Sequence, residues 1–229
     1  MRKFSDGFGR LLFCLFTLTL AAHAENNLIR NGTFDEGETT AQYWEPANGL
    51  TTFYIKEPGR GRIVMMNTQV ERKQALAWQQ TFQASPTSSL PKRILLPANS
   101  YASIGANEGV MLDSDLIDCQ PNQNYRLQAD VKGVGHPIIW IKGFLWHPTR
   151  KIWVDGYQTR LVPDTVSTSA WHTCSIGFNP TAQSPRIQKI KVRLYAYWPN
   201  GQYYFDQIKI EPITAEEMAE HVRQRNNAK

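Results

Sequence analysis

Aromatic side chains are the residues of this 229-residue sequence whose types and spacing point most directly to chemistry. Trp140, Trp146, Trp153 and Tyr157 lie within one short stretch, and Trp198 closely follows two tyrosines. An exposed aromatic ring packs against the C–H face of a sugar ring, while polar neighbours bind the hydroxyl groups. We therefore take these five aromatic residues as candidate ligand-binding residues.

Half of the aromatic residues on alternating strands must face a core, so not every ring is a candidate. We assign Trp44, Trp78 and Trp171 to the core. Trp146 and Trp153 flank the polar turn 147–151 and are the best candidates for an exposed pair. Trp140 lies among isoleucines, and its side chain could face either way.

Catalytic patterns are missing from the sequence. It has no G-x-S-x-G, H-E-x-x-H or C-x-x-C pattern and no phosphate-binding glycine loop. The acidic run 113–118 lacks the glycine and the glutamate that an EF-hand calcium loop requires. The sequence also nominates no pair of facing carboxylates for glycoside hydrolysis. We expect a protein that is not an enzyme.

The N-terminus is typical of a secretory signal peptide. A basic start precedes a 12-residue apolar run over 11–22, which is too short to span a bilayer. The small residues Ala22 and Ala24 mark a cleavage site, which predicts a signal peptide over 1–24 cleaved after Ala24. We expect a secreted or periplasmic protein with no stable membrane insertion after cleavage. In that compartment Cys119 and Cys174 form either a disulfide or two buried thiols.

The charge of the chain is modest and scattered. The formal net charge is +5, of which about +3 remains without residues 1–24. No basic run is dense enough to indicate a nucleic-acid partner.

Short alternating apolar runs predict an all-β chain. The predicted strands lie at 52–55, 62–66, 77–83, 125–131, 136–145, 171–178, 187–198 and 202–210, separated by turn residues. This pattern favours an antiparallel β-sandwich over alternating strands and helices. We expect one β-sandwich domain over 25–212. Thr214 and Glu217 form a capping box, which predicts a short polar C-terminal helix within the tail 213–229.

Four weak motifs in a fixed order resemble one known family. The segment 27–37 followed by Trp44, the segment 121–133, the strand 170–178 and the closing strand 203–210 resemble carbohydrate-binding modules of the cellulose- and xylan-binding type. This resemblance implies a two-sheet antiparallel jelly-roll β-sandwich of the galactose-binding-like type. It also implies binding of a poly- or oligosaccharide.

The resemblance further implies a structural calcium ion where the opening motif meets the closing strand. Its candidate ligands are Asp35 and Asp206, with Glu36 as a substitute. The chain departs from the family pattern at Asp35, where glutamate is usual, and at Gln207, where a second aspartate is usual. The alternative is that Asp206 is hydrogen-bonded without a metal.

The sequence thus favours a secreted, non-catalytic carbohydrate-binding β-sandwich. One alternative is a structural or interaction sandwich that binds a protein partner and no sugar. A small glycoside hydrolase is the other. An exposed row of aromatic residues on one face would favour carbohydrate binding over the sandwich that binds a protein partner.

Overall fold

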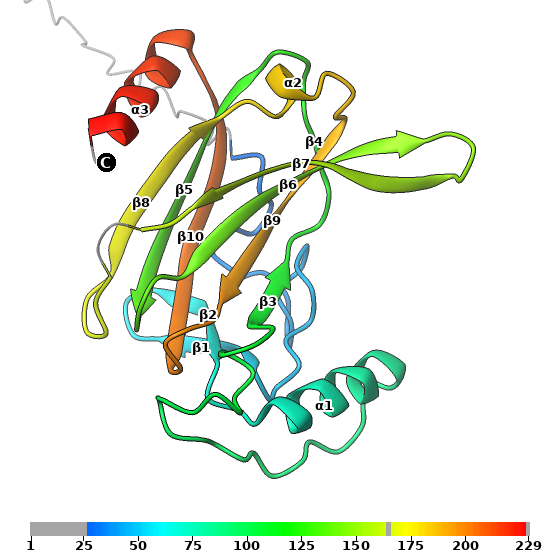
Figure 1. The fold of residues 1–229 in the computed structure, drawn as a ribbon, viewed down its shortest axis with the longest axis vertical. Helices are drawn as coiled ribbons and strands as arrows, with labels where there is room; N and C mark the ends of the chain where they lie inside the picture. The colour runs from blue at the N-terminus through cyan, green and yellow to red at the C-terminus, as the bar shows by residue number, and fades with distance from the viewer. Residues whose placement is uncertain (1–26, 164–165, 228–229) are drawn as a thin grey trace, which may run out of the picture.

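The chain folds as two antiparallel sheets packed face to face. The structure is a computed structural model and describes residues 27–163 and 166–227 (Figure 1). The predicted signal peptide and its cleavage site lie outside the described residues. No helix of the described residues is long and apolar enough to cross a membrane. The all-β, two-sheet sandwich with a C-terminal helix is confirmed.

The first sheet has the strand order β1-β2-β10-β5-β8. Its strands are β1 (Thr52–Glu57), β2 (Gly61–Asn67), β10 (Gln202–Ile213), β5 (Asn124–Gly133) and β8 (His172–Phe178). The second sheet has the order β3-β9-β6-β7, with β4 also paired to β9. Its strands are β3 (Val110–Asp113), β9 (Lys189–Ala196), β6 (Ile138–His147), β7 (Ile152–Leu161) and β4 (Ile117–Asp118). Every strand pair is antiparallel.

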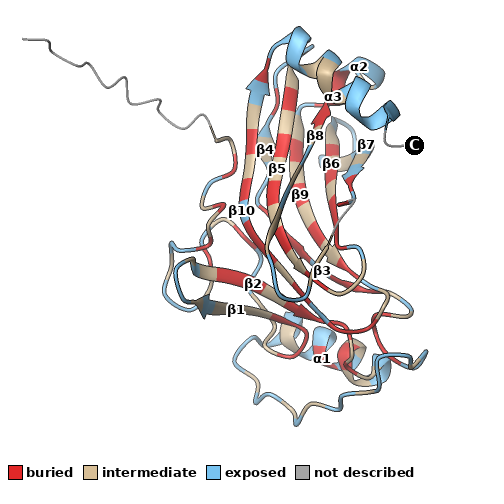
Figure 2. Ribbon diagram, turned by 90° about the vertical axis from the view of Figure 1, so that its left-hand side faces the viewer, coloured by how far each residue is buried: buried red, intermediate tan, exposed pale blue. Residues whose placement is uncertain are grey.

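The core lies between the two sheets and follows the alternation of the strands. In β5 and β9 buried and half-buried residues alternate along the whole strand (Figure 2). Leu127 and Phe205 of the first sheet and Val192 and Ile141 of the second are fully buried. Each such side chain stabilises the fold by about 2 kcal/mol. The alternation leaves the other side chains of each strand on an outer face.

One predicted strand is wrong: residues 77–83 belong to helix α1 (Arg72–Ala84). Ala75, Trp78 and Phe82 are spaced by three and four residues, which places them on one side of a helix. Ala75 and Trp78 are buried, and the indole of Trp78 donates to the Asn48 carbonyl at 2.7 Å. Packing of these three side chains outweighs the polar–apolar alternation that favours a strand.

The opening segment of the described chain lies along β10, as the resemblance implies. The side chain of Asn27 accepts from the Ile210 N–H at 2.9 Å and donates to the Ile208 carbonyl at 3.1 Å. The Ile208 N–H donates to the Gly32 carbonyl at 2.9 Å. A Cβ on Gly32 would lie 1.9 Å from the Ile208 oxygen, so this close approach requires glycine.

The two remaining helices are short or peripheral. Helix α2 (Pro180–Gln183) is a single turn, and helix α3 (Ala215–Asn227) packs on β8 and β5 without a buried residue. The predicted capping box is confirmed. The Glu217 N–H donates to the Thr214 hydroxyl at 3.2 Å, and the Thr214 N–H donates to the Glu217 carboxylate at 2.9 Å.

Of the two alternatives for Cys119 and Cys174, the structure has two thiols and no disulfide between them. Cys174 lies on β8 in the first sheet, and its thiol donates to the Ala129 carbonyl at 3.4 Å. Cys119 follows β4 in the second sheet, and its thiol donates to the Ile187 carbonyl at 3.7 Å. The two cysteines therefore belong to different sheets.

Candidate functional site

The outer face of the second sheet carries aromatic and charged side chains in cross-strand rows. β6 lies between β9 and β7, and its outward residues Trp140 and Lys142 each have a neighbour on both strands. Trp140 lies between Arg193 and Arg160, and Lys142 lies between Lys191 and Gln158. These positions alternate with the buried residues of the same strands, so the strand period places them on one surface.

A shallow pocket lies on this outer face. Its volume is about 210 Å³, and it is lined by Met111, Trp140, Lys142, Gln158, Arg193 and Tyr195. These residues come from β3, β6, β7 and β9. Two aromatic rings beside amide, ammonium and guanidinium donors match the chemistry of a sugar ring, which offers C–H faces and hydroxyl groups.

Asp113 anchors the charged side of the pocket. Its carboxylate accepts two hydrogen bonds from the Arg193 guanidinium, at 2.7 and 2.8 Å, and also pairs with Lys191. Burial alone raises the pKa of Asp113, but its bonds to Arg193 and Lys191 outweigh burial and hold the pKa below its ordinary value. The paired carboxylate therefore stays ionised and fixes the Arg193 side chain beside Tyr195 and Trp140.

Glu45 lies next to Asp113 at the rim. Its carboxylate accepts from the Asp113 N–H at 3.1 Å. Burial, together with the negative charge of Asp113, raises the pKa of Glu45 above its ordinary value. The two carboxylates therefore differ in how readily they take up a proton.

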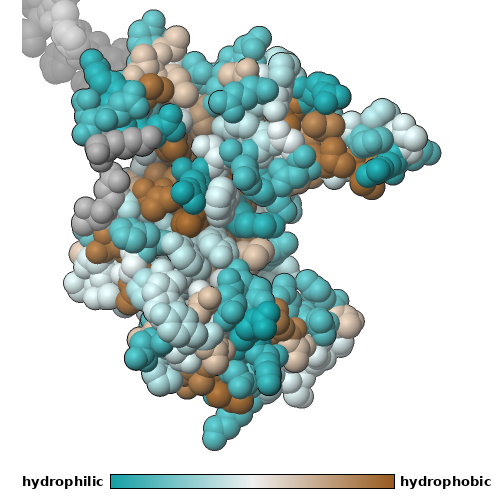
Figure 3. Space-filling view, in the orientation of Figure 1, coloured by the Kyte–Doolittle hydropathy of each residue, from teal (hydrophilic) through white to brown (hydrophobic). Residues whose placement is uncertain are grey.

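The end of the β6–β7 hairpin projects from the sandwich as an arm (Figure 1). Trp146 and Trp153 pair across this hairpin, with ring centroids 5.3 Å apart in an edge-to-face arrangement. Trp146 and Ile152 are exposed. Figure 3 shows the outline of the molecule hollowed between this arm and the lower lobe, which in Figure 1 carries α1.

The five predicted aromatic residues lie at four separate places. Trp140 lines the pocket, and Trp146 and Trp153 lie together on the arm. Trp198 stacks on the exposed ring of Tyr101, with centroids 5.2 Å apart. Tyr157 packs against the hydrophobic core, although part of it borders a second shallow pocket with Gln158.

The polar half of the pocket is absent from the predicted site residues. Arg193 and Tyr195 alternate with buried residues in β9, and Gln158 lies at an outward position of β7. The alternation of residues 189–196 was the available signal, because it places two lysines, an arginine and a tyrosine on one side of a strand.

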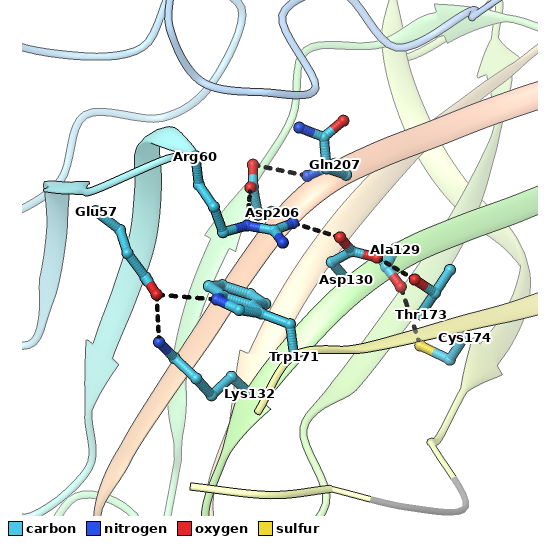
Figure 4. Close-up of polar contacts among 10 residues, drawn as sticks. All are labelled: Glu57, Arg60, Ala129, Asp130, Lys132, Trp171, Thr173, Cys174, Asp206 and Gln207. Carbon is cyan, nitrogen blue, oxygen red and sulfur yellow. Dashed lines mark hydrogen bonds and ion pairs between the residues drawn. The ribbon is translucent and has the colours of Figure 1, made fainter. Parts of the chain in front are cut away.

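The candidate calcium ligands are engaged with nitrogen donors. Asp206 is fully buried on β10, and its two oxygens accept from Arg60 at 2.8 Å and from the Gln207 N–H at 2.8 Å (Figure 4). Asp35 accepts from the Arg62 N–H at 2.7 Å, and Glu36 is exposed. Within the described residues no three acidic, histidine or cysteine side chains form a metal-binding group. This arrangement does not fit a calcium ion held by these carboxylates.

The Arg60 guanidinium supplies the positive charge at this place. It bridges Asp206 and Asp130, and Asp130 also accepts from the Thr173 hydroxyl at 2.6 Å (Figure 4). Burial raises the pKa of Asp206 above its ordinary value, although the pairing with Arg60 opposes this. Arg60 thereby ties the β1–β2 turn to β10 and β5.

Trp171 was assigned to the core, and this prediction is wrong. The half-buried ring lies beside the Arg60 network, with Arg60 4.3 Å and Lys132 4.8 Å from its centroid. Its indole N–H donates to Glu57 at 3.0 Å, and Glu57 also binds Lys132 at 2.7 Å (Figure 4). The ring therefore packs within an ion-pair network on the first sheet, formed by Arg60, Lys132 and Glu57.

Comparisons with known proteins give structural likeness without sequence matches. No family model and no curated protein match the chain. The Family 16 carbohydrate-binding module 2 is similar over 80% of this chain and 99% of its own, with a TM-score of 0.46 and 15% identity. The module TmCBM61, solved with β-1,4-galactotriose, is similar over 82% of this chain and 99% of its own, with a TM-score of 0.45 and 11% identity.

A third similar structure is the enzymatically active domain of tailspike protein 4 from bacteriophage CBA120. It covers 82% of this chain with a TM-score of 0.48 and 9% identity, and this chain spans 22% of its length. The structural matches are mostly carbohydrate-binding modules, the class that the sequence motifs resemble. TM-scores below 0.5 do not indicate which ligand this chain binds, and only its own side chains bear on that question.

Proposed function

We propose that this protein is an exported, non-catalytic carbohydrate-binding β-sandwich that holds a poly- or oligosaccharide on the outer face of its second sheet. The pocket formed by Trp140, Tyr195, Arg193, Gln158 and Lys142 is the observation that carries this proposal. The rings stack on a sugar face, and the amide, ammonium and guanidinium groups bind its hydroxyl oxygens. Export rests on the predicted signal peptide over 1–24.

The shape of the site supports a chain-like ligand. Trp140 and Trp146 are both outward residues of β6, six positions apart, which corresponds to roughly 20 Å along the strand. The hairpin arm extends the face beyond the pocket (Figure 3). A single sugar ring would fill the pocket, whereas a longer chain could also reach Trp146 and Trp153.

The carboxylate beside the pocket supports binding without catalysis. A glycoside hydrolase needs a carboxylate that is free to donate a proton or to attack. Asp113 already bonds to Arg193 through both oxygens and pairs with Lys191.

A protein partner that binds the arm, where Trp146 and Ile152 are exposed, is the second prediction.

Substitution of the pocket tryptophan tests the proposal. The full-length mature protein is screened against a glycan array and insoluble polysaccharides, and the best ligand is titrated with the Trp140→Ala variant. We expect Trp140→Ala to weaken binding about fivefold or more, because stacking on one ring contributes on the order of 1 kcal/mol or more. Tyr204→Ala, which removes an aromatic ring from the first sheet, is the matched control and should bind normally.

A failure would have a clear form. If no glycan binds, or if Trp140→Ala and Tyr204→Ala bind equally well while both stay folded by circular dichroism, the proposed site is wrong.

A further inference from the structure

Positive charge is concentrated on the outer face of the second sheet. The outward positions of β6, β7 and β9 include five cationic side chains: Lys142, Arg160, Lys189, Lys191 and Arg193. The outward acid on the same three strands is Asp155, which pairs with Lys142 at 2.8 Å. Asp113 and Asp118 pair with β9 from the neighbouring strands, and Glu45 lies at the rim. The cations outnumber the carboxylates even when these rim acids are included.

The strand register places two of these cations directly opposite each other. Lys142 on β6 and Lys191 on β9 are cross-strand partners. Like charges at directly opposed positions destabilise a sheet. Asp155 beside Lys142 and Asp113 beside Lys191 offset this repulsion, so the register keeps two cations side by side on the face.

Cations also flank the stacking residue of the pocket. Trp140 lies between Arg193 on β9 and Arg160 on β7. In the described part of the chain Arg160 pairs with no carboxylate, and its guanidinium lies 5.5 Å from the Trp140 ring centroid. A guanidinium binds a carboxylate or sulfate through two parallel hydrogen bonds. A sugar stacked on Trp140 would therefore present a ring substituent to a guanidinium on either side.

We propose that the saccharide held on this face is acidic, with its carboxylate or sulfate groups paired to Arg160, Lys142 and their neighbours on β9. This inference rests on the proposed function, since it names the class of saccharide for the same pocket. A uronic-acid polymer and a sulfated polymer share this chemistry. A neutral polymer would use the rings and offer no anion to Arg160, which pairs with no carboxylate of the described residues.

Calorimetric titration of the mature protein with four soluble polymers tests the inference. Polygalacturonate carries carboxylates, dextran sulfate carries sulfates, and galactan and xylan are neutral backbones. We expect an acidic polymer to bind more tightly than both neutral polymers, with affinity that falls as sodium chloride is raised, because salt screens charge pairs. The stronger of the two acidic polymers identifies the anionic group.

Three single variants connect the result to this face. Lys142→Gln and Arg160→Gln should each weaken binding of the acidic polymer about tenfold, the loss expected for one charged hydrogen bond. Lys56→Gln removes an exposed charge from β1 in the first sheet and should bind like the unmodified protein. Chemical denaturation checks that all three variants remain folded.

Each remaining outcome is decisive. Equal or tighter binding of a neutral polymer, with no effect of Lys142→Gln and Arg160→Gln, overturns the acidic ligand and leaves the proposed function standing. An equal loss in Lys56→Gln means nonspecific attraction to a polyanion and also overturns the inference. Failure to bind any polymer here or on the glycan array overturns the proposed function itself.

Discussion

Asp113 is the residue on which the charged half of the pocket depends. It is 3% exposed at the end of β3, where it holds Arg193 through two hydrogen bonds and also pairs with Lys191. A buried carboxylate is costly unless it is paired, and these two cations provide the pairing. The same contacts aim the Arg193 guanidinium at the surface where we place the saccharide.

The lowered pKa of Asp113 makes the stability of the protein depend on pH. The pKa of the unfolded carboxyl is about 3.9, and that of the folded one is lower. The stabilisation by the ionised group is therefore complete above about pH 5 and is lost as the pH falls through the folded pKa. We expect Asp113→Asn to cost about 3 kcal/mol of unfolding free energy near neutral pH. Urea unfolding at a series of pH values should show this difference shrinking as acid is added.

The matched control for this prediction is Asp118→Asn. Asp118 pairs with Lys189, but its side chain is 78% exposed, so its removal should cost less than about 1 kcal/mol. A cost of Asp113→Asn that stays constant between about pH 6 and pH 2 would show that the charge of Asp113 is not the source of its effect.

At the residue scale, the sequence could nominate rings but could not decide which way they face. Trp140 is flanked by Ile139 and Ile141, and the structure buries both isoleucines and turns the ring outward. Tyr157 follows a register shift between β6 and β7, which helps to explain why a residue close to the half-buried Trp153 packs inward. Such a shift changes the face of every later side chain and leaves little mark in the sequence.

At the scale of elements, β10 connects the N-terminal segment, the β1–β2 turn and β5. Asn27 contacts it through its side-chain amide and Gly32 through its carbonyl, and Arg60 reaches its buried Asp206. The side chain of Arg60 is 24% exposed and that of Asp206 is fully buried. A guanidinium therefore neutralises the carboxylate that the family resemblance had suggested as a calcium ligand.

Calcium removal and Arg60 removal should accordingly have different effects. We expect the melting temperature of the mature protein to be the same with calcium and with a chelator. Arg60→Met should cost about 3 kcal/mol, because it leaves Asp206 buried without its cation. Arg72→Met is the control, since Arg72 pairs with Glu108 at the surface, and it should leave the stability nearly unchanged. Differential scanning calorimetry measures all three proteins, and a clear drop in melting temperature with the chelator would contradict this account.

Most strands could be predicted because alternation is a local property. The predicted strands at 52–55, 62–66 and 125–131 all fall within strands of the first sheet. Helix α1 was missed because its apolar stripe is interrupted by polar residues and its anchor, the Asn48 carbonyl, lies 30 residues away. The Arg60–Asp206 pair spans 146 residues, and no local pattern encodes a contact of that separation.

At the scale of the whole molecule, the two outer faces of the sandwich differ in character. The outer face of the first sheet is partly covered by other parts of the chain. Arg60 forms ion pairs on one part of it, and helix α3 packs over β8 and β5 on another. The second sheet leaves Trp140 and Tyr195 beside a pocket, with the hairpin arm projecting at one end. A face with an open pocket lined by aromatic and cationic side chains is suited to a ligand, whereas a covered face is suited to stability.

Chemical-shift mapping tests the location of this ligand face most directly. The isotopically labelled mature protein is titrated with the saccharide that binds best, and the amide and side-chain signals are followed by NMR. We predict that the largest shifts lie on β6, β7 and β9, with the indole of Trp140 and the guanidinium of Arg193 among them. Shifts that cluster instead on β1, β2 and β8, with Trp140 unchanged at saturation, would contradict the assignment of the binding face.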